Sequence, residues 1–271
     1  MNKLLLLSAS LHQDVGLKRL NQVRQLLNEN SDLSLYEIFQ KMDNDSQNRF
    51  KNYSRESVSS ATSSAEKILT TSISNNIKII TTMINYPIVY AKGNISLLNA
   101  KTKVGIVGTR KPFDYIADLT MLVAEEISSL NIPIVSGLAT GSDTAAHRGG
   151  LAEKGSTIAV LPSGILSIYP YENMKLADMI AERGLLLSLF PPDFTIQKYS
   201  AVLRNSLLAD ISNVLILSQS TLTGGSCHAV NRFIKYKKPL YSFPFYETHY
   251  ELNKKIANTT SFPENQKYLF L

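Results

Sequence analysis

Three glycine-containing turns hold most of the residues in this chain whose chemistry suits an anion. They are Gly108-Thr109-Arg110-Lys111, the stretch from Ser136-Gly137 through Gly141 to Asp143, and Thr223-Gly224-Gly225-Ser226. Each precedes a helical pattern, and the first two directly follow short apolar runs. A strand, a tight turn and a helix in that order aim backbone N–H groups and the positive end of the helix dipole at a phosphate. The three turns therefore predict a phosphate-facing edge.

Charged side chains strengthen this prediction at two places. Arg110 and Lys111 add positive charge to the first turn. Arg204, which is followed by Asn205, lies in an otherwise apolar helical stretch, where an arginine needs a partner. That partner is either a carboxylate such as Asp210 or a phosphate.

Other polar residues near the turns have both structural and ligand-binding interpretations. Asp143 is suited to cap the following helix, and His147 lies four residues on, on the same helix face. The imidazole could hydrogen-bond a base or a phosphate, or it could hold the loop together. The rigid turn Tyr169-Pro170-x-x-Asn173 offers a ring that could stack on a base, although a core tyrosine is more common.

Patterns typical of catalysis are sparse. The chain has no Gly-x-x-x-x-Gly-Lys-Ser/Thr loop, no complete dinucleotide-binding fingerprint and no Cys/His spacing typical of zinc. Cys227 and His228 are neighbours in sequence, which does not place them face to face. We therefore expect a binding protein without catalytic residues, cofactor or metal.

The composition favours a globular protein with a polyanionic partner. The 271 residues are 44% hydrophobic and carry 28 Lys and Arg against 22 Asp and Glu, a net charge of +6. The single cysteine fits a reducing compartment. No apolar run approaches the roughly 18 residues that span a bilayer, and residues 1–7 suggest a buried helix rather than a signal peptide. We expect a cytoplasmic protein.

The pattern of apolar residues divides the chain into four segments. We predict a small helical domain at 1–75, a strand-containing lead-in at 76–102, a Rossmann-like domain at 103–245 and a tail at 246–271. Residues 52–64 form a weak helix, a loop or both. Strands are expected at 77–83, 88–90, 104–107, 133–135, 157–161, 185–189, 214–217 and 240–243, and helices at 115–130, 144–154, 173–182, 202–209 and 226–236.

This alternation indicates the α/β class, with a mostly parallel sheet covered by helices on both faces. In such sheets ligands bind at the carboxyl ends of the strands. Every glycine turn named above lies at that edge.

Taken in order, these motifs resemble the DNA-processing protein A family (DprA, also called Smf). That family runs Val-Gly-Ser-Arg, Ser-Gly-x-Ala-x-Gly-x-Asp-x-x-Ala-His, Ala-Val-Leu, Tyr-Pro-x-x-Asn, Leu-Leu-Ser-Glu-Phe-Pro-Pro, Arg-Asn-Arg and a Ser-Gly-Ser/Thr turn. The similar segments here are 107–110, 136–147, 159–161, 169–173, 187–192, 204–205 and 225–226. The resemblance covers roughly residues 80 to 245.

The resemblance implies a homodimeric protein, not an enzyme, that binds single-stranded DNA and loads the RecA recombinase onto incoming DNA in natural transformation. It places Arg110 in the DNA-binding pocket. The predicted DNA- and phosphate-binding residues are Gly108, Thr109, Arg110, Lys111, Ser136, Gly137, Gly141, His147, Tyr169, Asn173, Arg204, Asn205, Gly224, Gly225 and Ser226.

Five positions depart from the family pattern: Pro162, Leu166, Leu189, Ser206 and Asp210. Ser206 replaces an arginine, which weakens the case for phosphate binding. Two other functions stay open. One is a Rossmann-like protein that binds or cleaves nucleotides, whose Gly-Gly-x-Gly-Thr-x-x-Glu pattern is only half present at 224–226. The other is a family member that has lost its DNA contacts and binds a protein partner.

Overall fold

The computed structural model describes residues 17–30, 33, 37–38, 41–42, 55–81, 83, 85–152, 155–243 and 251–253. They divide into two compact units, Met1–Tyr90 and Ala91–Leu271. The predicted helix at 1–7 and most of the tail lie outside the described residues. None of the helices described is long and apolar enough to cross a membrane.

The first unit contains helices α2 (Leu17–Glu29) and α5 (Arg55–Ser74) and the short strand β1 (Lys78–Ile80). In α2, Leu20, Val23 and Leu27 are buried, at the spacing of one helix face. Helix α5 begins at Arg55 and runs through the Ser/Thr-rich stretch, so the helix interpretation holds over 55–64, and residues 52–54 lie outside the described residues. The strand predicted over 77–83 is shorter, at three residues.

The second unit holds the predicted α/β arrangement. After β2 (Val89–Gly93), which straddles the boundary, its strands are β3 (Val104–Val107), β4 (Ile134–Ser136), β5 (Thr157–Leu161), β6 (Leu185–Ser188), β7 (Val214–Leu217) and β8 (Leu240–Ser242). The helices are α6 (Asp114–Ser129), α7 (Ser142–Gly150), α8 (Met174–Arg183), α9 (Ser200–Ile211) and α10 (Cys227–Lys235), with 3₁₀ turns η1 (Ile95–Asn99) and η2 (Tyr171–Asn173).

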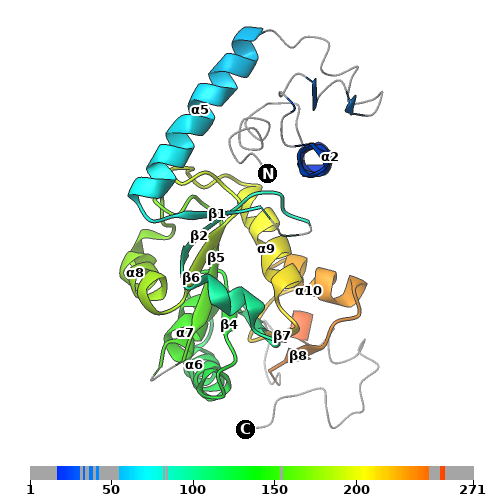
Figure 1. Cartoon of the computed structure of the whole chain (residues 1–271). Helices are drawn as coiled ribbons and strands as arrows, with labels where there is room; N and C mark the ends of the chain where they lie inside the picture. Colours follow the sequence, from blue (N-terminus) through cyan, green and yellow to red (C-terminus); the bar gives the residue numbers. More distant parts are fainter. Residues whose placement is uncertain are drawn as a thin grey trace. The chain divides into compact units, whose positions relative to one another are not determined.

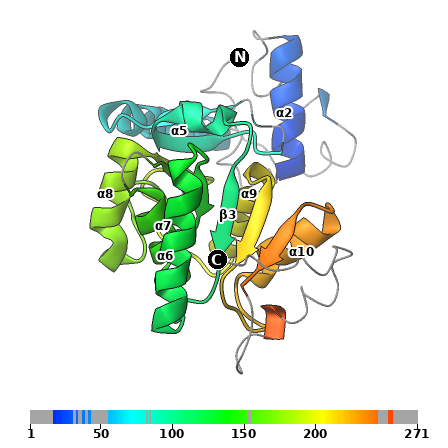
Figure 2. The ribbon, with the colours of Figure 1, turned by 90° about the horizontal axis from the view of Figure 1, so that it is seen from below.

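The order of the strands creates a reversal beside β3. Their order is β2-β6-β5-β4-β3-β7-β8, and every neighbouring pair from β6 to β8 is parallel. The chain steps outward from β3 to β6 and then returns to the other side of β3 with β7. Right-handed crossovers then place α6, α7 and α8 on one face and α9 and α10 on the other, as Figures 1 and 2 show. The α/β class with a Rossmann-like parallel sheet is confirmed.

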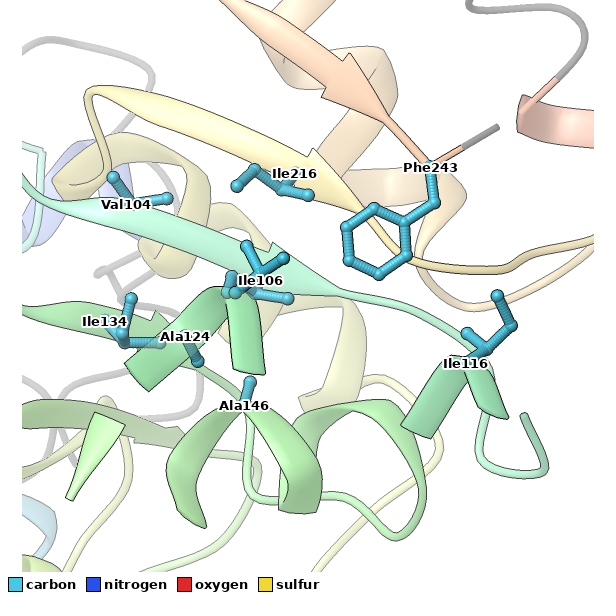
Figure 3. Packing of buried hydrophobic residues seen from close by; sticks show 9 residues of the cluster. Val104, Ile106, Ile116, Ala124, Ile134, Ala146, Ile216 and Phe243 are labelled. Atoms are coloured by element: carbon cyan, nitrogen blue, oxygen red, sulfur yellow. The ribbon is translucent and has the colours of Figure 1, made fainter. Parts of the chain in front are cut away.

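Apolar side chains between β3 and the helices form the core of this unit (Figure 3). Ile106 is fully buried there with Ile134 and Ile216 of the neighbouring strands and with Ala124 and Ala146 of the covering helices. The small alanines allow α6 and α7 to approach the sheet closely. This packing holds the carboxyl end of β3, where the first glycine turn begins.

Helix α7 differs from the prediction at both ends. It begins at Ser142 rather than 144 and ends at Gly150, before Gly155. Gly141 occupies the N-cap position with φ 74°, a conformation that favours glycine. Asp143 lies inside the first turn, so its predicted role as the N-cap is wrong.

His147 supports the turn between β4 and α7 from beneath. The ring is fully buried, its Nε2 accepts the Leu138 N–H at 3.2 Å, and its Nδ1 lies 2.7 Å from Thr157 Oγ1. Thr157 Oγ1 itself donates to Ile134 O at 2.9 Å, so Nδ1 must carry the proton. The neutral imidazole is therefore fully satisfied. A ligand contact through His147 is excluded in this conformation, and its structural interpretation holds.

We predict that Ile106→Ala lowers the free energy of unfolding by about 3 kcal/mol, because it leaves a cavity in the packed core. Urea unfolding measures this loss. Ile234→Ala removes the same atoms from a side chain of α10 that is 44% exposed, and it should cost under about 0.5 kcal/mol. Equal losses in the two variants would contradict the assignment of the core.

We also predict that His147 makes the fold sensitive to acid. Burial, and then the charge of Arg204, lower the pKa of His147 from 6.5 to about 3. Below pH 6.5 the unfolded chain binds a proton that the folded chain does not, so stability falls with pH in this window. The loss attributable to His147 is about 2 kcal/mol between pH 7 and pH 5.

The measurement is urea unfolding across this pH range for the native chain, His147→Gln and His228→Gln. Removing His147 should flatten the pH dependence, even if the variant is less stable at pH 7. His228 is exposed on α10, and its variant should keep the native slope. An unchanged slope in His147→Gln would refute the assignment.

Candidate nucleic-acid interface

A cavity of about 290 Å³ opens where the carboxyl ends of β3 and β7 meet. Its wall is formed by the first glycine turn, the third glycine turn and the polar residues Arg204 and Asn205 of α9. We call it the phosphate pocket. It lies beside β3, where the strand order reverses and where open parallel sheets bind their ligands.

The first two turns are tied to each other and to the end of β7. The N–H of Thr109 donates to Gln219 O at 2.7 Å, and the N–H of Ser142 donates to Thr109 O at 3.1 Å. The hydroxyls of Ser218 and Ser142 are 2.7 Å apart. A Cβ on Gly108 would collide with both hydroxyls, so glycine is required where the turns meet.

The third turn presents backbone to the open side of the pocket. A Cβ on Gly225 would meet nothing within 4 Å. Its carbonyl accepts the Asn205 amide at 2.9 Å, and the hydroxyl of Ser226 pairs with that of Ser220 at 2.6 Å. Helix α10 starts directly after this turn, so its positive end faces the pocket.

Two arginines bring positive charge to the lining of this pocket. Arg110 is exposed, and its side chain has no ion pair or hydrogen bond within the described part of the chain. Arg204 is only 6% exposed, and one of its terminal nitrogens donates to Gly137 O and, at 3.1 Å, to Val160 O. Its Nε is buried and has no partner among the described atoms.

Burial lowers the pKa of the Arg204 guanidinium, Asp143 raises it again, and the charge of Arg110 lowers it further. The two cations therefore repel each other. An anion between them would relieve this repulsion and replace the water lost by Arg204.

The buried partner of Arg204 is Asp143, at 3.8 Å, and the predicted alternative Asp210 is wrong. Asp210 forms a bidentate pair with Arg232, at 2.5 and 2.6 Å. Arg204 and Asp210 are six residues apart on one helix, so their side chains leave it in different directions. Burial raises the pKa of Asp143, while Arg204 and the N–H of Ala139 favour its charged form.

Most of the predicted site residues gather around this opening. Eight of them line the phosphate pocket: Gly108, Thr109, Arg110, Arg204, Asn205, Gly224, Gly225 and Ser226. Lys111 is exposed next to the first turn but lines neither cavity. Gly141 holds the start of α7.

Three of the predicted residues are buried beneath the turns and line neither cavity. Ser136 is fully buried and donates to Ile106 O, and His147 holds the second turn. Asn173 is buried, and its amide donates to Leu138 O at 2.9 Å and Thr144 Oγ1 at 2.8 Å. We therefore leave these three out of the proposed contact surface.

A second groove, of about 390 Å³, continues from the phosphate pocket. Arg110 and Arg204 line both cavities, together with Ala139 and Ala201. The far wall of the second groove includes Tyr169, which is 43% exposed. The ring of Tyr169 is thus open to a ligand and does not belong to the core.

Asn253, in the tail, was missed by the sequence analysis. It is fully buried, its oxygen accepts the N–H of Ser220 at 3.1 Å, and its amide donates to Ser218 O at 2.9 Å. Ser220 lines the phosphate pocket, so the tail fixes the carboxyl end of β7. The tail has mixed polarity and no repeat, so its sequence contains no pattern that predicts a contact between Asn253 and β7.

The described residues contain no group of three or more His, Cys, Asp or Glu that could hold a metal ion. Within the phosphate pocket the carboxylate is Asp143, which is engaged by Arg204 and a backbone N–H. The arrangement suits binding of an anion through fixed donors.

The chain is similar in sequence to one family of known proteins. The model of the family DNA recombination-mediator protein A matches residues 55–262. DNA processing protein DprA of Bacillus subtilis is 35% identical over 157 residues, 58% of this chain and 53% of that protein. The DprA of Streptococcus pneumoniae is 32% identical over 157 residues, 58% of this chain and 55% of its own length. The chain thus matches about half the length of these curated relatives.

Two solved structures resemble the whole fold or its larger part. DNA processing protein A of Helicobacter pylori, whose structure was described for its mode of single-stranded DNA binding, has a TM-score of 0.63 and 31% identity, over 67% of this chain and 87% of that one. DprA of Streptococcus pneumoniae has a TM-score of 0.74 over 92% and 88%, at 22% identity, which supports the fold alone. The family match, the shared fold and the ordered motifs agree: the chain belongs to the DNA recombination-mediator protein A family.

Proposed function

We propose that this chain binds single-stranded DNA, with a backbone phosphate in the phosphate pocket. The observation that carries the proposal is the pair of arginines, one exposed and one buried, that face the same glycine-lined cavity. Family membership and the single-stranded DNA binding described for the H. pylori relative support it. The contact set is Gly108, Thr109, Arg110, Arg204, Asn205, Gly224, Gly225 and Ser226, with Lys111 adding charge nearby.

Despite the departures from the family pattern, Arg110 and Arg204 line this pocket. Ser206, which replaces an arginine, lines neither cavity and its hydroxyl donates to Val202 O. Asp210 is neutralised by Arg232. Of the five departures, only Pro162 lines a cavity, and it lies in the second groove. The presence of Arg110 and Arg204 in one cavity supports DNA binding over a protein that has lost it.

A nucleotide-cleaving activity has less support. The third turn lacks the Gly-Thr-x-x-Glu half of that pattern, and Asp143 is held by Arg204 rather than free to act as a base. General acid or base catalysis needs a carboxylate within reach of the reacting proton. We therefore propose a binding protein that is not an enzyme and acts in the cytoplasm.

We further propose that the chain works as a homodimer and brings the RecA recombinase onto incoming DNA during natural transformation. This proposal rests on membership of the family.

Arg110→Ala should weaken binding of an oligonucleotide of about 20 thymidines roughly tenfold, because it removes an unpaired cation from the pocket. Fluorescence anisotropy between about 50 and 200 mM NaCl should show steep salt dependence for the native chain and a slope lower by about one in the variant. Arg148→Ala removes an equal charge from the exposed end of α7 and should bind nearly as the native chain does.

A flat salt response of the native chain, or equal losses in the two variants, would contradict a phosphate contact at Arg110. Duplex DNA of the same length should bind more weakly, because its paired and stacked bases are not available to an exposed ring such as that of Tyr169.

For the proposed assembly, light scattering should give a mass near twice the 30.1 kDa of one chain. The immobilised protein should capture purified RecA without DNA. Arg110→Ala should capture RecA equally well, because this contact is separate from the pocket. A monomeric mass, or RecA capture that requires DNA, would contradict the proposed assembly and direct contact.

A further inference from the structure

The loop after β7, residues 218–221, joins the phosphate pocket to a segment that does not line it. We call it the β7 loop. On the pocket side, the carbonyl of Gln219 accepts the N–H of Thr109, in the first glycine turn, at 2.7 Å. Ser220 and Thr221 line the cavity themselves. A displacement of the β7 loop would therefore disturb both the first glycine turn and the wall of the pocket.

On its other side the β7 loop is held by the tail. The N–H of Ser220 donates to Asn253 Oδ1 at 3.1 Å, and the carbonyl of Ser220 accepts the Leu252 N–H at 3.3 Å. The side-chain amide of Asn253 also donates to Ser218 O at 2.9 Å and to Phe243 O at 3.4 Å. Both polar backbone groups of Ser220 are thus bonded to the tail.

These contacts lie in the interior, where water does not replace a partner that is lost. Ser220, Leu252 and Asn253 are all buried. A buried N–H or carbonyl that loses its partner bears the full cost of its lost hydration, so removal of the Asn253 side chain favours movement of the β7 loop toward solvent. Leu252 and Asn253 line neither cavity, so an effect of a pocket ligand on them is indirect.

Ser220 also connects the tail to the third glycine turn. Its hydroxyl pairs with that of Ser226 at 2.6 Å, and Ser226 directly precedes the first residue of α10. Ser226 lines the phosphate pocket together with Gly224 and Gly225. The tail, the wall of the pocket and the start of α10 therefore meet at a single residue.

We propose that Asn253 is a positioning residue for the phosphate pocket, and that docking of residues 252–253 and binding of a strand in the pocket favour each other. This rests on the proposed binding of single-stranded DNA. Asn253 keeps the β7 loop and the third glycine turn in the arrangement that receives a phosphate. Coupling between two sites is reciprocal, so a bound strand must also hold the tail more firmly.

Asn253→Ala should weaken binding of an oligonucleotide of about 20 thymidines roughly tenfold in fluorescence anisotropy, because the binding arrangement of the β7 loop would fall to about a tenth of the population. Asn213→Ala is the matched control. The Asn213 side chain accepts the Lys103 N–H at 2.9 Å, so it also ties β7 to a distant segment, but at the amino end of the strand. Neither Asn213 nor Lys103 lines a cavity, and this variant should bind as the native chain does.

The native chain provides a second measurement, which does not depend on whether Asn253→Ala folds. Saturation with the same oligonucleotide should slow hydrogen exchange of the Leu252 amide about tenfold, the factor that reciprocity requires. The Asn213 amide, which donates to Lys103 O at 2.9 Å, should exchange at its unbound rate. A residue that only stabilised the fold would give no such selective slowing.

Native affinity in Asn253→Ala, equal losses in the two variants, or unchanged exchange at Leu252 would overturn the inference and leave DNA binding standing. No binding of the oligonucleotide by the native chain would instead refute the proposed function.

Discussion

The buried guanidinium of Arg204 is the constraint on which the rest of the site depends. A charge removed from water is tolerated only when it is paired and hydrogen-bonded. Here the carbonyls of Gly137 and Val160 and the carboxylate of Asp143 meet that demand. Gly137 must be glycine because a Cβ there would overlap the guanidinium. The second glycine turn, the end of β5 and helix α9 are therefore held in one arrangement by a single side chain.

That arrangement leaves positive charge that is only partly paired. Arg204 keeps one buried nitrogen without a partner among the described atoms, and Arg110 adds a second positive charge to the lining of the same cavity. The buried hydrogen bonds of His147, Asn173 and Asn253 hold the surrounding turns from below, so the donors are fixed before a ligand arrives. Preorganised donors lose little freedom when a ligand binds.

The sequence predicted the succession of strands and helices along the chain and the parallel arrangement of the strands. The predicted strands at 157–161 and 214–217 have the same first and last residues as β5 and β7. A strand that is buried on both faces forms a nearly continuous apolar run, so the ends of the run mark the ends of the strand. The predicted start of helix α7 was wrong, because the capping residue determines where this helix begins. Gly141, and not Asp143, occupies the N-cap position, because glycine readily adopts the positive φ found there. The carboxylate of Asp143 instead pairs with Arg204.

By itself the sequence determined the α/β class, the succession of strands and helices, and the positions of the three glycine turns. These features depend on the spacing of apolar residues and on the backbone conformations that single residues can adopt, and both can be inferred from the sequence. Only the tertiary structure decided which carboxylate pairs with Arg204, that His147 faces the core, and that Asn253 reaches back to β7. Such contacts join residues tens of positions apart, and their geometry exists only once the strands have been brought side by side.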